Sequence, residues 1–186
     1  YKVYQWQFEN LPAIYPESSL PDHGSFVPRL EFSEYQSWDQ AFRPVQSQSA
    51  FSEKLSKEME IFVHRIKAEA TSELDFLLKL QKKIATGLAT YKIPFSYCGF
   101  KARSLEEIWT SNAGTELEKA VLLSALFRQA DFDASPVFVS NFDLSEKVSG
   151  LLTFSKTMVH TRINGECILL PSDKPVQDHF LYSQAG

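Results

Sequence analysis

The sequence predicts an α+β fold in which a layer of helices packs on an antiparallel sheet. Two observations support this class. Helix-type patterns come first, between residues 37 and 129, and strand-type patterns follow between residues 134 and 170, whereas an alternating α/β fold would mix them. A length of 186 residues with 44% apolar residues suits one sizeable core. We expect a sheet of about three to five strands.

Residues 1–32 are predicted to form an extended strap along the surface, without a core of their own. Residues 1–9 alternate as a strand does, with aromatic side chains at positions 4, 6 and 8. Four prolines follow between residues 12 and 28, and each lacks the N–H that a helix or a central strand needs. We expect this segment to be a linker or the end of a preceding domain, and residues 33–186 to form the domain itself.

Three helices are predicted before residue 90. A short one begins at Trp38 and ends near Pro44, a longer one covers residues 51–70, and Ser72 with Asp75 three residues later marks the start of the third. The two long helices should pair through their apolar stripes, which are Leu55, Met59, Phe62 and Ile66 on one and Leu74, Leu77, Leu80, Ile84 and Leu88 on the other.

The central element is predicted to be a buried helix from Thr115 to Gln129. Thr115 and Glu118 form the pattern of a capping box, in which each side chain accepts the backbone N–H of the other residue. From Ala120 to Phe127 only Ser124 is polar. A helix that is apolar nearly all round belongs inside the fold. An irregular aromatic segment at 91–99 and a helical turn at 104–109 precede it.

The strands are predicted after the central helix. Residues 134–140 read as one strand, and residues 153–163 and 166–170 as the two arms of a hairpin. Between the arms, Asn164-Gly165 is the dipeptide that suits a tight type I′ turn.

Composition excludes several classes of function. The formal net charge is −4, and Lys and Arg are scattered, so a nucleic-acid surface is not expected. No apolar run approaches the roughly 18 residues that cross a bilayer. Cys98 and Cys167 are too few for a disulfide framework and lack metal-ligand spacing. We therefore expect no metal and no cofactor, while the two cysteines could be free or bridged.

Residues 114–140, GTELEKAVLLSALFRQADFDASPVFVS, resemble the signature of bacterial transglutaminase-like domains. In that family Gly-Asp-Cys opens an Ala- and Leu-rich helix, which leads into a strand, and the Cys is the nucleophile. Residues 6–33 are similar to the join between an N-terminal β-rich domain and the transglutaminase-like domain in large bacterial envelope proteins. The resemblance implies a papain-like core and a periplasmic or extracellular location.

The resemblance also places the three catalytic positions. Matching Gly114 and Lys119-Ala120 to the family pattern puts Glu116 at the Cys position. Counting from the Asn164-Gly165 turn puts Lys156 at the His position and Pro171 at the Asp position. A carboxylate, an ammonium group and a pyrrolidine cannot supply a thiolate, an acid/base near neutral pH and its orienting carboxylate. We therefore expect an inactive site, in which Glu116 and Lys156 face one cleft and form a close ion pair.

Other residues are weaker candidates for the cleft. His160 is four residues after Lys156 on a strand and should share its face, but a lone strand His is usually a packing or surface residue. Asp173 is a possible salt-bridge partner of Lys156. Trp109 could line the cleft or cover the core, and we favour the core. Cys98 and Cys167 have no basic partner at motif spacing, which indicates structural thiols.

Three functions remain open at this point. The first, which we favour, is a module that has lost catalysis and binds or scaffolds a peptide or a neighbouring domain of the same chain. The second is a cysteine-type amide hydrolase, protease or transglutaminase with a non-standard site. The third is a purely structural spacer domain. Fold analogy cannot choose among them, because function belongs to the site.

Overall fold

The computed structural model describes residues 3–11, 13, 31–140, 144 and 148–176. Its elements in chain order are α1 (Trp38–Gln46), the 3-10 helix η2 (Ser49–Phe51), α2 (Lys57–Glu69), α3 (Glu73–Gly87), β1 (Ala89–Tyr91), α4 (Phe95–Cys98), α5 (Leu105–Thr110), β2 (Ala113–Thr115), α6 (Glu116–Gln129), β3 (Ala134–Ser140), the 3-10 helix η3 (Leu151–Thr153), β4 (Phe154–Ile163) and β5 (Glu166–Pro171). Most of the predicted strap, residues 1–2, 12 and 14–30, lies outside the described residues.

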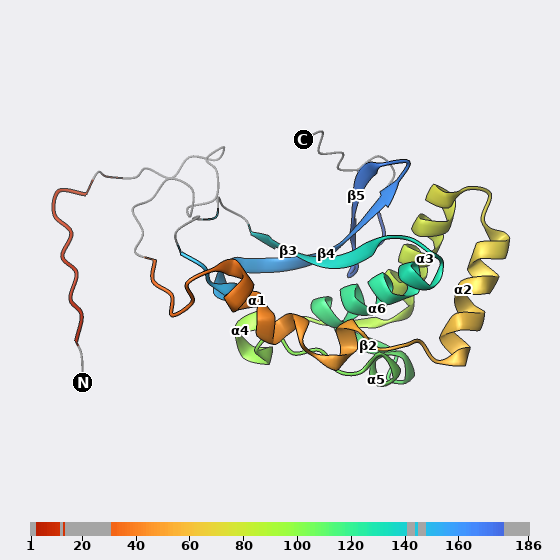
Figure 1. The fold of residues 1–186 in the computed structure, drawn as a ribbon, viewed down its shortest axis with the longest axis horizontal. Helices are drawn as coiled ribbons and strands as arrows, with labels where there is room; N and C mark the ends of the chain where they lie inside the picture. The colour runs from red at the N-terminus through yellow and green to blue at the C-terminus, as the bar shows by residue number, and fades with distance from the viewer. Residues whose placement is uncertain (1–2, 12, 14–30, 141–143, 145–147, 177–186) are drawn as a thin grey trace.

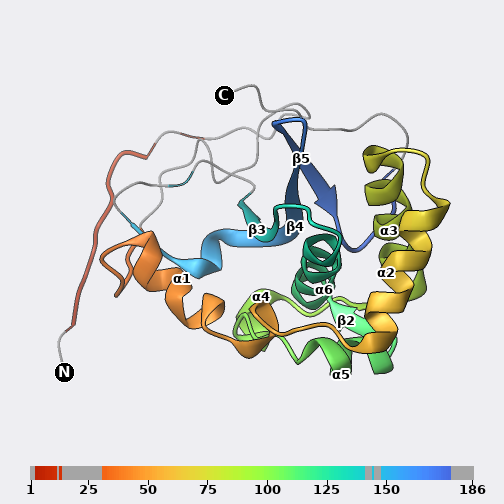
Figure 2. The same cartoon turned by 45° about the vertical axis from the view of Figure 1, so that its right-hand side comes forward.

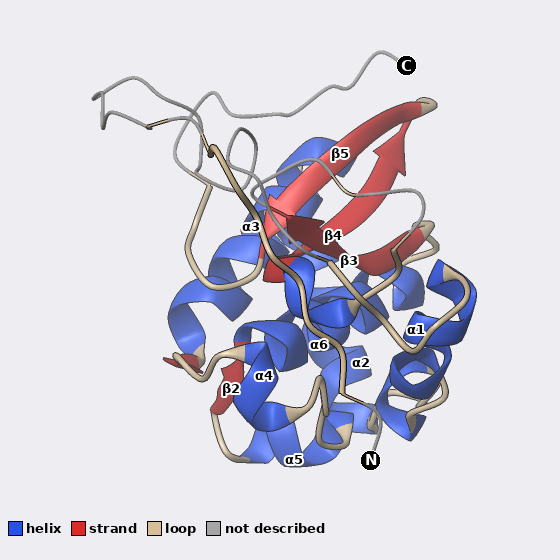
Figure 3. Cartoon of the chain, turned by 90° about the vertical axis from the view of Figure 1, so that its left-hand side faces the viewer, coloured by secondary structure: helices blue, strands red, loops and turns tan. Residues whose placement is uncertain are grey.

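The predicted α+β class is confirmed. Strands β3, β4 and β5 form an antiparallel sheet in that order, and β1 and β2 form a separate parallel pair. Figures 1 and 2 show α6 directly beneath the sheet, with α2 and α3 to one side and α5 below. Viewed from the side, the three strands lie over a layer of helices (Figure 3). The larger sheet therefore has three strands, within the expected range.

The central helix is buried as its apolar run predicts. Every side chain from Leu117 to Phe127 is buried, and the exposed fraction of Leu122, Leu123 and Leu126 is 0%. Thr115 is the N-cap residue, and the capping box with Glu118 is complete. Since sheet and helices both pack on α6, its first turn is held in a fixed place relative to β4 and β5.

The hairpin of β4 and β5 turns at Asn164-Gly165, as predicted. Their φ angles are 52° and 85°, and both positive values fit a type I′ turn. Along β4 the side chains of Thr157, Val159 and Thr161 are buried toward α6. The intervening residues are partly or fully exposed. Lys156 and His160 therefore share the face of the sheet that points away from α6.

Several predicted boundaries were wrong. The helix expected over residues 51–70 begins at Lys57, because Phe51 belongs to η2 and Ser56 is the N-cap residue. Helix α1 continues through Pro44 to Gln46, since a proline in the last turn removes a single backbone bond. Residues 3–9 form no strand with the described part of the chain. The irregular segment 91–99 contains α4 and the end of β1.

Candidate functional site

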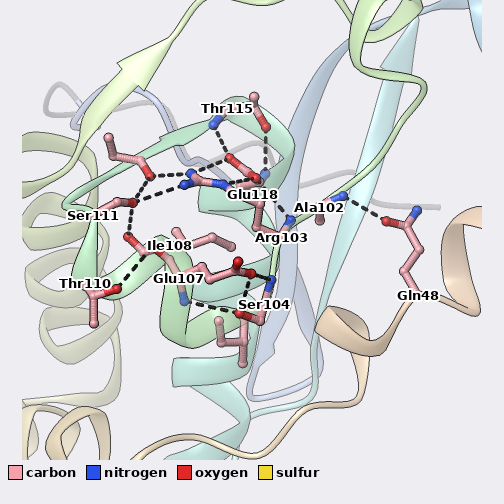
Figure 4. Close-up of polar contacts among 12 residues, drawn as sticks. Gln48, Ala102, Arg103, Ser104, Glu107, Ile108, Thr110, Ser111, Thr115 and Glu118 are labelled. Carbon is pink, nitrogen blue, oxygen red and sulfur yellow. Dashed lines mark hydrogen bonds and ion pairs between the residues drawn. The ribbon is translucent and has the colours of Figure 1, made fainter.

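An ion pair organises the loop that leads into α6. Arg103 donates from Nε to Oε1 of Glu118 at 2.7 Å and from Nη2 to Oε2 at 3.0 Å. The same guanidinium donates to the carbonyl oxygen of Ala113 at 2.8 Å, so that β2 is tied to the helix start. The backbone N–H of Thr115 donates to Oε2 of Glu118 at 2.8 Å. Figure 4 shows Arg103 between Glu118 and the residues before α6.

The pKa of Glu118 follows from this arrangement. Burial by itself would raise it, but the hydrogen bonds from Arg103 and from the N–H of Thr115 outweigh burial, so the pKa is lowered. The carboxylate is therefore charged at neutral pH.

Three distant segments meet at the first turn of α6. Oε1 of Glu116 accepts the backbone N–H of Thr157, near the start of β4, at 2.7 Å. Ser172, directly after β5, donates its hydroxyl to the backbone carbonyl of Glu116 at 3.0 Å. The sequence places Glu116 at the start of this helix, Lys156 at the start of β4 and Pro171 at the end of β5. The three segments are neighbours, but the expectation that Glu116 and Lys156 face one cleft is wrong, because the side chain of Lys156 lies on the face of β4 that points away from α6.

The carboxyl group of Glu116 is harder to ionise than usual. Its pKa is raised, first by burial and further by the negative charge of Asp173. The N–H of Thr157 and the positive charges of Lys156 and Lys174 act in the opposite direction without cancelling the effect.

The expected close ion pair between Glu116 and Lys156 does not form. Within the described residues, the ion pairs shorter than 4.0 Å join Lys67 to Asp131, Lys79 to Asp75, and Arg103 to Glu118. Lys156 is exposed, and its charge reaches Glu116 through space alone. The reason lies in the alternation along β4: Thr157, Val159 and Thr161 are buried toward α6, so the side chain of Lys156 is directed to the opposite face. Ser155 is an extra residue between the pairs Ser140–Phe154 and Val139–Lys156, and this bulge lets Phe154 be buried on the same face as Thr157.

The other predicted cleft residues are scattered. His160 lies on the face of β4 that points away from α6, so it is not brought to Glu116. Trp109 packs edge-on against Phe62 on α2 at a centroid distance of 5.1 Å, as part of the core. Asp173 forms no ion pair with Lys156 among the described residues, but its charge affects both Glu116 and Lys119. Of the three, only Asp173 belongs to the surroundings of Glu116.

Pro171 and the two cysteines have structural positions. The carbonyl oxygen of Pro171 accepts a hydrogen bond from Nε2 of Gln81 on α3 at 2.7 Å. Cys98 and Cys167 are both free and half-buried, and Sγ of Cys98 contacts the carbonyl oxygen of Phe95 at 3.6 Å. The described residues contain no group of three or more His, Cys, Asp or Glu side chains that could hold a metal ion.

Sequence reasoning missed the role of Lys119, one turn into α6. Its exposed fraction is 0%, and Nζ donates to the carbonyl oxygens of Ala85 and Leu88 at 3.0 and 2.9 Å and to Oγ1 of Thr90 at 2.9 Å. Burial lowers the pKa of this amine. A lysine directly before the apolar run of a buried helix is the signal that could have identified it, since a buried ammonium group needs several acceptors.

A groove of about 570 Å³ lies at the opposite end of α6. The turn between α2 and α3, the loop from α6 to β3, and the tip of the β4–β5 hairpin form its walls. Its lining comes from short polar loops that are far apart in sequence, and no motif marks them. None of the predicted cleft residues lines this groove.

Comparison with known proteins defines the fold alone. No family model matches the chain, and no curated protein matches it. A solved structure from Parabacteroides distasonis, called a "putative protease", has a similar fold with a TM-score of 0.64 at 22% identity. The match covers 74% of this chain and 27% of that chain, so the chain spans about a quarter of the neighbour's length. Among the described helices, none is long and apolar enough to cross a membrane.

Proposed function

We propose that this chain is a catalytically inactive transglutaminase-like domain that serves as a binding or scaffolding module in an exported bacterial multidomain protein. One observation carries the proposal. The start of α6, the start of β4 and the end of β5 converge on Glu116, and the residues there replace the Cys, His and Asp of the resembling enzymes. The similarity to a much longer protein is consistent with a multidomain setting.

The chemistry of these replacements supports inactivity. The carboxylate of Glu116 already accepts the N–H of Thr157, so it holds the sheet on the helix. Lys156 at the His position provides no imidazole to take up a proton from a nucleophile. Pro171 has no carboxylate with which to orient a base. The site therefore joins α6 to β4 and β5, but it lacks the groups that an acyl transfer requires.

The partner we propose is a peptide or a neighbouring domain of the same chain. The N-terminal segment favours a neighbouring domain as the partner, because the side chains of Tyr4, Trp6 and Phe8 are 68%, 50% and 54% exposed. Trp6 stacks between Tyr4 and Phe32 at centroid distances of 6.0 and 6.1 Å. An exposed aromatic row of this kind is typical of a surface that another surface covers.

A second candidate is a cysteine-type amide hydrolase with a non-standard site. The similarity to a protein called a "putative protease" favours it. This function requires Cys98 or Cys167 as the nucleophile, yet Cys98 lies on α4 and Cys167 on the outer part of the hairpin, paired with Arg162 in the register. Neither thiol lies on the first turn of α6, where the helix dipole favours a thiolate.

Ester hydrolysis decides between the two candidates. The intact protein and its Cys98→Ser and Cys167→Ser variants are assayed with p-nitrophenyl acetate and with a peptide amide. We expect equal rates for all three proteins, no higher than the rate with free cysteine at matched concentration. Turnover that disappears in either variant would establish the hydrolase and end the proposal of an inactive domain.

A further inference from the structure

The groove at the far end of α6 has the size and the lining of a site for a small polar ligand. Its volume of about 570 Å³ lies within the range of roughly 300–1,000 Å³ that is typical of ligand sites. Phe132 lines it and stacks on the buried ring of Phe76 at a centroid distance of 5.6 Å and an interplanar angle of 13°. Three chain segments supply the walls around this aromatic surface, so a ligand would touch several elements at once.

Two charged side chains of opposite sign line the groove without a partner. Arg162 comes from the hairpin and Glu73 from the first turn of α3, and both are exposed. Within the described part of the chain, neither side chain takes part in an ion pair shorter than 4.0 Å. Lys67, by contrast, is engaged, because its Nζ donates to the carbonyl oxygen of Ala130 at 3.2 Å. The unpaired guanidinium of Arg162 and the unpaired carboxylate of Glu73 are thus available to a ligand.

Two further acids face the same space. Oδ2 of Asp131 lies 3.9 Å from Nζ of Lys67, so the positive charge of Lys67 partly neutralises the carboxylate of Asp131. Asp133 directly precedes β3, where Ala134 pairs with Thr161, so the register places it close to Arg162. These two residues form no ion pair shorter than 4.0 Å among the described residues, and the guanidinium stays available. Asp133 should nevertheless compete with any anion that binds there.

We propose that this groove binds a short peptide with free ends, its carboxylate on Arg162 and its ammonium group on Glu73. A guanidinium is the side chain that matches a carboxylate with two parallel hydrogen bonds. The space corresponds to about 19 waters at roughly 30 Å³ each, which exceeds the needs of a single amino acid. This site is independent of Glu116 and of whether the domain is catalytically inactive.

The test uses one tripeptide in three forms. Tri-L-alanine, its N-acetyl form and its C-terminal amide are titrated into ¹⁵N-labelled protein, and amide shifts at residues 130–133 and 162–164 report on binding. We expect saturable binding of the free tripeptide. Each blocked form should bind about tenfold more weakly, because a charge-assisted hydrogen bond is lost.

Variants assign each end of the peptide to its residue. Arg162→Gln should weaken the free tripeptide about tenfold and abolish the difference between the free acid and the amide. Glu73→Gln should abolish the difference between the free and the acetylated amine. Asp133→Asn should tighten the N-acetyl form, since the competing anion is gone. Lys82→Gln, on an exposed site of α3 outside the groove, is the matched control and should change nothing.

Two outcomes would overturn the proposal. One is the absence of saturable shifts around the groove in the unmodified protein, a result that does not depend on any variant folding. The other is binding that ignores acetylation and amidation, or an Arg162→Gln protein that still distinguishes the acid from the amide. Hydrolysis assays at Glu116 have no bearing on either result.

Discussion

The pair of Arg103 and Glu118 allows the most detailed prediction, because its two partners differ in burial. The side chain of Glu118 is 5% exposed and that of Arg103 is 37% exposed. Without Glu118, the guanidinium can turn to water. Without Arg103, the buried carboxylate keeps the N–H of Thr115 but loses its counter-charge. The replacement Arg103→Met should therefore destabilise the fold more than Glu118→Gln.

The magnitude follows from the same exposures. Removing one partner of a wholly buried pair costs roughly 3 to 5 kcal/mol, whereas an exposed pair contributes about 0 to 1 kcal/mol. With Arg103 more than a third exposed, solvent screening brings the expected loss to about 2 kcal/mol for Arg103→Met and about 1 kcal/mol for Glu118→Gln. For a chain of 186 residues, these values correspond to a fall in Tm of about 4–8 °C and 2–4 °C.

Urea unfolding of both single variants and the double variant measures the coupling between the two residues. We expect a coupling free energy of about 1 kcal/mol at pH 7. Since the pKa of Glu118 is lowered in the fold, this stabilisation is present above the unfolded pKa and is lost as the pH falls through the folded pKa. A coupling near zero at pH 7, or a greater loss for Glu118→Gln than for Arg103→Met, would refute the reasoning.

Three further predictions concern single residues. Glu116→Gln should leave stability at pH 7 unchanged or raise it by up to about 1 kcal/mol, because the raised folded pKa makes the charged form unfavourable; the difference should vanish below the unfolded pKa, as calorimetry at pH 7 and pH 4 will show. Lys119→Met should cost about 2 to 4 kcal/mol in urea unfolding, since it removes the donor from two buried carbonyl oxygens and from the part-buried hydroxyl of Thr90. The lowered pKa of this lysine also predicts that the wild-type protein gains stability as the pH rises toward 10. Gly165→Ala should lower stability by about 1 to 2 kcal/mol, because the φ of 85° is unfavourable for a Cβ.

Several elements were predicted correctly from short sequence motifs that favour a single backbone conformation. The capping box at Thr115, the continuous apolar run of α6, and the Asn164-Gly165 turn each depend on residues close together in the chain. Strand β3 was predicted with its observed bounds, Ala134–Ser140. Such signals carry enough information because the backbone conformation they favour is the one the fold uses.

Features that depend on contacts between residues far apart in the chain could not be predicted from the sequence. The three-residue strands β1 and β2 exist because each pairs with the other, and strands so short leave no periodic pattern. The bulge at Ser155 is set by pairing with β3. The hydrogen bond from the N–H of Thr157 to Glu116, found in place of the predicted ion pair, joins residues 41 positions apart in the chain. Likewise, the groove at the far end of α6 is formed by loops that meet in the folded chain alone.

The central claim is that α6, β4 and β5 retain the arrangement of a catalytic site whose groups have been replaced. Its most direct test is the rate of p-nitrophenyl acetate hydrolysis by a protein carrying Glu116→Cys, Lys156→His and Pro171→Asp, in a background where Cys98→Ser and Cys167→Ser remove the other thiols. Residue 156 lies on the other face of β4, but its charge acts on Glu116, so we predict that an imidazole at this position still gives an acyl-enzyme burst and turnover well above both the parent and the Glu116→Cys single variant. A triple variant that folds but hydrolyses no faster than the single variant would contradict the claim that these three positions form one site.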